Sequence, residues 1–140
     1  MANLLTVDDF PAIRAALDSS LDASTLPNKI IDEDIYIGAA WDEVLERYPT
    51  AESETDATVL TRLRRAAIYF AAARLAPVVV RITSLSVSVQ GVNYSKPVFD
   101  PAKRAAELRA LADAELDAIL TPGELSRPTM FAVASGQRGR

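Results

Sequence analysis

Residues 63–77 read LRRAAIYFAAARLAP, and this stretch decides the fold. Leucine, alanine and phenylalanine recur along one face at helical steps, and from Ala66 onward the opposite face is apolar as well. A helix that is apolar on all sides is buried on all sides. The pattern therefore predicts a central helix that begins at a capping Asp56, ends at Ala76 and carries the rest of the chain packed around it.

Three further amphipathic patterns predict the helices that surround this centre. They lie at residues 5–17 (LTVDDFPAIRAAL), 32–48 (DEDIYIGAAWDEVLERY) and 102–120 (AKRAAELRALADAELDAIL). Thr6 and Asp9 have the spacing of a capping box for the first helix, expected from about residue 7 to residue 19. Asp100-Pro101 supplies a capping residue and a proline at the start of the last helix.

Between Pro77 and Pro97 the pattern changes from helical to β-type, with valine and serine alternating. Pro77 is expected to end the central helix, and Gly91 to form the turn of a short hairpin. A single hairpin is marginal in water, so the arm at residues 78–96 should pack against its own helices or a neighbouring chain. Its serines fit either the wet face of a strand or backbone pairing with another subunit.

These patterns define the expected fold class. It is mainly α: a small bundle of about four helices, with an extended β-type arm before the last helix and a C-terminal tail. Residues 1–120 form the helical domain, which includes the arm, and residues 121–140 form the extended tail. The tail combines proline and glycine with both apolar and basic side chains, and such a segment is expected to order on binding.

The composition of the chain excludes several kinds of functional site. The chain has 140 residues, of which 49% are apolar and 24% charged, as in ordinary globular domains. It contains neither cysteine nor histidine, which excludes disulfides and thiolate metal sites and removes the commonest general base. No nucleotide-binding glycine loop or nucleophile elbow occurs. We therefore expect a structural protein rather than an enzyme, with no cofactor and no metal.

The sequence also predicts no membrane contact. Acids and a proline interrupt residues 8–11, so the N-terminus lacks a signal-peptide pattern. The longest apolar stretch, residues 66–80, is too short and too broken to span a bilayer. We expect a soluble intracellular product.

Several single features are assigned structural roles. The acids at residues 32–34 lack the spacing and glycine of a calcium loop, so they are expected to stabilise a helix start. Trp41 is expected to belong to the core. Three acids on the polar side of the second helix are expected to be solvated, namely Asp42, Glu43 and Glu46.

Charge is distributed unevenly along the chain. Residues 1–60 hold thirteen acids and three bases, for a charge of −10, whereas residues 61–140 hold six acids and twelve bases, for +6. Two interpretations fit: the halves neutralise each other within one fold, or an acidic and a basic face meet between copies. Three bases should project outward from the central helix as a candidate contact patch between subunits, namely Arg62, Arg64 and Arg65.

Taken in order, these parts resemble the head–tail connector, or adaptor, proteins of tailed bacteriophages and related particles. The resemblance covers about residues 4–120. It rests on the four helical segments quoted above and on the arm SLSVSVQGVNYS at residues 84–95, which lies between the last two helices.

The resemblance implies a structural role in the virion neck. Small helical subunits of that family form a dodecameric ring beneath the portal, which extends the DNA channel and offers a platform for the stopper or tail. The family has no known catalytic residues. The implied partners are other copies of the chain, the portal, a stopper or tail protein, and genome DNA that passes without sequence-specific binding. Assembly would take place in the host cytoplasm.

Two contact segments follow from the same resemblance. The arm would reach a neighbouring subunit or the channel through Ser86, Val87, Ser88, Val89, Gly91 and Tyr94. The C-terminal segment would dock on the portal through Leu125, Arg127, Met130, Phe131 and Val133.

Two alternatives stay open from the sequence. One is another neck component, such as a stopper or tail-completion protein; these proteins are more often built around β-barrels or sandwiches. The other is a small helical module that binds DNA or a regulator through the basic turn at residues 62–65.

Overall fold

The computed structural model describes residues 4–89 and 99–120, and over these residues the protein is mainly α and contains no strand. The chain forms, in order, η1 (Val7–Asp9), α1 (Phe10–Leu17), α2 (Asn28–Ile31), the π-helical turn η2 (Asp34–Gly38), α3 (Ala39–Arg47), η3 (Ala51–Ser53), α4 (Ala57–Val89) and α5 (Pro101–Leu120). The expected mainly α class is confirmed.

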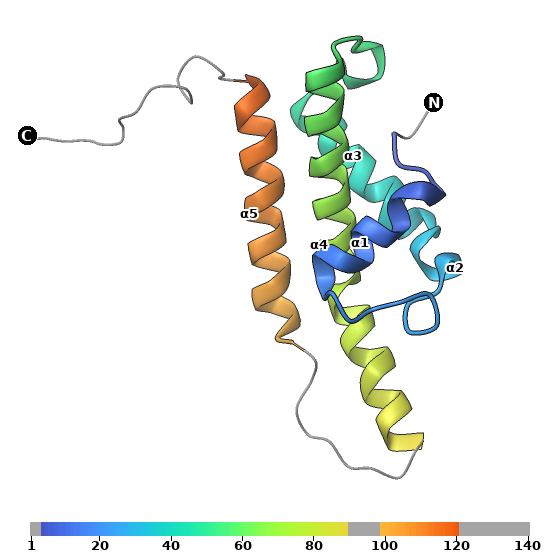
Figure 1. The fold of residues 1–140 in the computed structure, drawn as a ribbon. Coiled ribbons are helices and arrows are strands. Elements are labelled where there is room, and N and C mark those ends of the chain that lie inside the picture. The colour runs from blue at the N-terminus through green and yellow to red at the C-terminus, as the bar shows by residue number, and fades with distance from the viewer. Residues whose placement is uncertain (1–3, 90–98, 121–140) are drawn as a thin grey trace, which may run out of the picture.

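Helix α4 is the centre of the fold, as its all-round apolar pattern predicts. Helices α1, α3 and α5 and the η2 turn all contact it. Figure 1 shows α5 running alongside α4, with α1 crossing in front and the α2 region on the side away from α5. Five alanines of α4 are fully buried, namely Ala66, Ala67, Ala71, Ala72 and Ala76. Their small side chains let the neighbouring helices approach closely.

Larger side chains from the surrounding elements fill the space around these alanines. Ile13 and Leu17 of α1, Val44 of α3 and Leu116 of α5 are completely buried. Each belongs to the apolar stripe of its helix, so the amphipathic patterns correctly identified the inward faces.

The predicted helix starts are confirmed at three positions. The Thr6 backbone N–H donates to Asp9 Oδ2 at 2.9 Å, and Thr6 Oγ1 accepts from the first turn, which completes the capping box. Asp56 Oδ1 accepts from the Thr58 N–H at 2.8 Å at the start of α4. Asp100 Oδ1 does the same at the start of α5. These bonds satisfy N–H groups that a helix start leaves without partners.

The predicted second helix begins within two residues of its expected start, as a π-helical turn at Asp34 that continues directly into α3. Residues 32–33 precede the η2 turn, and α3 itself starts at Ala39. Glu33, the residue before η2, makes no capping bond with its side chain. The expected helix-start role of the three acids is therefore not seen as side-chain capping in the structure.

The largest correction concerns the arm. Residues 78–89 are helical and continue α4, so the prediction of an extended β-type arm is wrong there, as is the prediction that Pro77 ends the helix. Pro77 itself is exposed, whereas Val78 and Val79 beside it are 7% and 1% exposed. Burial of these valines favours continuation of the helix and offsets the cost of a proline in its interior.

The remaining predictions for this region and for the tail fall outside the described residues. They concern the rest of the arm, including Gly91 and Tyr94, and the tail at residues 121–140. Within the part of the chain that the structure describes, no helix has the length and hydropathy needed to cross a membrane.

A buried arginine fixes the loop between α1 and α2. Arg14 is 6% exposed, and its Nε donates to the Leu26 carbonyl at 2.8 Å. Its guanidinium also donates to the Asn28 side chain. Because a buried cation is stable only when it is hydrogen-bonded, this side chain holds the loop against the C-terminal half of α1.

Candidate interaction surface

Ion pairs between distant segments stabilise the arrangement of the helices. Glu43 of α3 accepts from Arg74 of α4 at 3.0 Å and from Arg109 of α5 at 2.5 Å. Arg109 also lies over the Phe70 ring, 5.8 Å from its centroid. The expectation that Glu43 is solvated is therefore wrong: two helices place cations against it. Asp42 and Glu46 are exposed, as predicted.

Several ion pairs within the chain join an acid of residues 1–60 to a base of residues 61–140. Arg64 lies 3.8 Å from Asp9, and both cations paired with Glu43 belong to the basic half of the chain. This supports the interpretation that the two halves neutralise each other at these positions. Other acids of the first half stay outside such pairs, as described below.

The structure places the predicted basic patch at the surface near α1. Arg62 Nη1 lies 2.9 Å from Glu115 Oε1. The other two pairs are longer: Arg65 lies 3.9 Å from Glu115, and Arg64 lies 3.8 Å from Asp9. The Arg65 side chain is 54% exposed. The patch thus consists of one well-paired arginine and two cations that remain largely open to solvent.

A shallow groove lies between α1 and α4, next to this patch. Its volume is about 360 Å³, and its lining consists of Ala12, Ala15, Ala16, Arg65, Ile68 and Tyr69. Five of these six side chains are apolar or aromatic, and Arg65 supplies the one charge. Ala12 and Ala15 are exposed and small, so this face of α1 leaves room for a larger side chain from outside.

A second groove, of about 530 Å³, lies between α1 and α5. Leu111, 48% exposed, and Ala16 are among its apolar lining residues, while Arg104 and Glu107 supply its charges. The Arg104 guanidinium donates to the Leu17 carbonyl at the end of α1 and pairs with Glu107 at 3.3 Å. The two charged side chains of this groove are therefore already paired within the chain.

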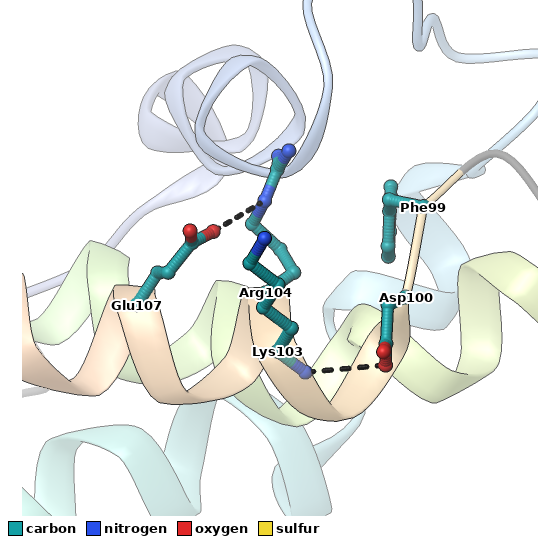
Figure 2. Close-up of a pocket in the computed structure, with 5 residues that line it drawn as sticks. All are labelled: Phe99, Asp100, Lys103, Arg104 and Glu107. Carbon is teal, nitrogen blue, oxygen red and sulfur yellow. Dashed lines mark hydrogen bonds and ion pairs between the residues drawn. The ribbon is translucent and has the colours of Figure 1, made fainter.

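Figure 2 shows the adjoining hollow at the start of α5, which shares Arg104 and Glu107 with the second groove. The Arg104 guanidinium lies 5.1 Å from the centroid of the Phe99 ring, which is a cation–π distance. Asp100 is engaged with backbone N–H groups of α5. Of the residues around the hollow, Arg104 connects the first turns of α5 to the end of α1 through the Leu17 carbonyl.

An exposed apolar residue lies among the acids of the η2 region. Ile35 is 62% exposed, and Asp32, Glu33 and Asp34 immediately before it are exposed as well. No ion pair joins any of these three acids to another residue in the described ranges. We refer to residues 32–35 as the acidic knob.

Comparison of the chain with protein-family models, with curated proteins and with solved structures found no match.

The other candidate residues of the sequence are placed as follows. Ser86, Val87, Ser88 and Val89 form the last turn of α4, and the remaining contact residues of the arm and tail lie outside the described ranges. Trp41 is 4% exposed and belongs to the core, as expected. Among the described residues, no cluster of acids could hold a metal ion.

Sequence reasoning missed two residues, the buried Arg14 and the exposed Ile35. Arg14 was hidden because its partners are twelve and fourteen positions away. Ile35 falls outside the apolar stripe of the second helix and directly follows three acids, a position that favours exposure on an amphipathic helix.

Proposed function

We propose that this protein is a structural subunit of a bacteriophage neck, which forms a ring between the portal and the tail apparatus and extends the DNA channel. The observation that carries the proposal is the order of the helical segments: a first helix that starts at the Thr6–Asp9 capping box, an acidic second segment, a buried alanine-rich central helix and a closing helix. The resemblance to the connector family rests on the helices alone, because the expected arm is helical up to Val89.

The surface supports an assembly role over a catalytic one. The grooves around α1 are shallow and mainly apolar, and they carry no pair of opposed carboxylates of the kind that general acid–base chemistry uses. Apolar grooves beside charged patches are typical of protein contact sites. A ring further requires two different contact faces on one subunit. The groove between α1 and α4 and the acidic knob are two candidates for such faces.

The alternatives have less support. Stopper and tail-completion proteins are more often β-rich, whereas residues 4–89 and 99–120 contain no strand. A DNA-binding module would use the bases at residues 62–65, but Arg62 already pairs with Glu115 at 2.9 Å, and the chain as a whole is acidic, with a net charge of −4. Two open arginines on an acidic protein give weak support for phosphate binding.

Electron microscopy of the purified protein, alone and mixed with the portal protein of the same particle, tests the proposal. We expect rings with a central opening, either free or attached to the portal. A protein that stays monomeric in both samples would overturn the ring. In the same assay, a variant that lacks residues 121–140 should keep its far-UV helical spectrum and lose portal attachment. Normal attachment of that variant would refute docking through the tail.

A further inference from the structure

We propose that the acidic knob of one subunit docks in the α1–α4 groove of the next, with Ile35 on the exposed alanines and the acids facing Arg64 and Arg65. This inference rests on the proposed ring and specifies which surfaces form its subunit contact.

The shape of the knob supports this contact. Ile35 has the largest exposed fraction, 62%, among the large apolar side chains of the described residues. It lies in a π-helical turn, a feature that is frequently found at functional sites. Exposure of a branched aliphatic side chain is unfavourable in water, so its burial in a contact would favour association.

The shape of the groove is complementary. Ala12 and Ala15 are small and exposed on α1, while Ile68 and Tyr69 form part of the wall on α4. A volume of about 360 Å³ gives room for a branched side chain. A large residue entering between small ones is the common way in which a contact buries an anchor.

Charge favours this groove over the one between α1 and α5. The knob carries three acids without a cation in the described part of the chain, and the α1–α4 groove carries Arg65 with Arg64 nearby in sequence. Their ion pairs within the chain are long, at 3.8 and 3.9 Å, so their charges remain open to further partners. In the other groove, Arg104 and Glu107 already neutralise each other.

The geometry makes the contact directional. The η2 turn and the α1–α4 groove are different surfaces of one subunit, so a knob and a groove remain free at the two ends of any linear pair. Such a heterologous contact closes into a ring when the rotation between copies permits it.

Cysteine crosslinking tests the contact directly, because the chain has no cysteine of its own. Full-length I35C protein is mixed with full-length A15C protein and mildly oxidised. We expect a disulfide-linked pair of chains, and at least tenfold less product when A15C is replaced by A114C, a control at an exposed alanine of α5. Equal or no crosslinking in the two mixtures would overturn the inference.

A charge exchange gives an independent measurement. E33R and R65E should each weaken self-association about tenfold or more in mass photometry, and the double variant E33R/R65E should restore it. Ile35→Asp should also weaken association, whereas Leu120→Asp, at a 49% exposed residue at the end of α5, should not. Far-UV spectra and Trp41 fluorescence report whether each variant is folded. Additive losses without rescue would overturn the pairing.

The outcomes separate this inference from the proposed function. Rings that assemble normally from I35D protein overturn the contact and leave the ring intact. Closed dimers that crosslink between positions 35 and 15 support the contact and overturn the ring. Crosslinking of A15C to F131C in the doubly substituted chain would assign the groove to the protein's own tail, and protection of A15C from a thiol reagent only by the portal would assign it to the portal. Either result overturns the inference.

Discussion

Glu43 on α3 and Arg109 on α5, 66 positions apart in sequence, form an ion pair with 2.5 Å between Oε1 and Nη1. The other carboxylate oxygen of Glu43 pairs with Arg74 of α4. One side chain therefore connects three helices.

Replacing Glu43 by glutamine should lower the free energy of unfolding by about 1 kcal/mol, because both cations lose their charged partner while remaining partly exposed. Urea denaturation followed by the fluorescence of Trp41 measures the change. Glu46→Gln on the exposed side of the same helix is the matched control and should have almost no effect. Equal effects of the two variants would show that the network does not stabilise the fold.

Replacing Arg14 by methionine should cost about 2 kcal/mol of stability. Methionine keeps an aliphatic stem but leaves the Leu26 carbonyl and the Asn28 side chain without their donor. Hydrogen exchange should also accelerate at the amides of residues 20–26. Arg81→Met, at an exposed arginine of α4, is the control. A loss no larger than that of the control would contradict the role assigned to Arg14.

Replacing Pro77 by alanine should raise the free energy of unfolding by about 1–3 kcal/mol, because it restores a backbone donor in the interior of α4 and removes no buried side chain. Chemical denaturation gives the free energy, and the Cα chemical shifts of Val87 and Val89 should be helical in both proteins. Pro49→Ala, outside the helices, serves as the comparison. Extended-chain shifts at the two valines, or a loss of stability, would contradict a continuous helix.

The acid dependence of stability should include a contribution from Asp22. Hydrogen bonds from the Ser24 hydroxyl, and then from Thr25, lower the pKa of Asp22 to about 2 from its ordinary value of 3.8. Because the folded-state pKa is depressed, this contribution is present above pH 4 and disappears as the pH falls from about 4 to 2. The variant Asp22→Asn should show a flatter loss of stability over this range in urea titrations. Parallel curves for the two proteins would exclude the contribution.

Much of the helical framework was predictable because its signals are local. Capping residues such as Thr6, Asp56 and Asp100 act on N–H groups two or three positions away, so a linear pattern suffices to find them. The central position of α4 was predictable for a related reason: a helix without a polar face can only be buried.

The wrong prediction of a β-type arm at residues 78–89 also has a physical explanation. Alternating valine and serine favour strands only weakly, by fractions of a kcal/mol per residue. Burial of Val78 and Val79 in the bundle outweighs that preference. Long-range partners such as Glu43 with Arg109, or Arg14 with Asn28, are likewise set by tertiary packing, which a single sequence does not reveal.

The alanines at the middle of α4 have a consequence for how this protein tolerates change. They are fully buried in a helix that α1, α3 and α5 all contact, so a bulkier substituent there would strain the packing of α4 against its neighbours. Ala→Val changes at Ala67 or Ala71 should give proteins that fold at low temperature and unfold on warming. The buried alanines of α4 are thus the natural positions at which to obtain a temperature-sensitive form of the protein.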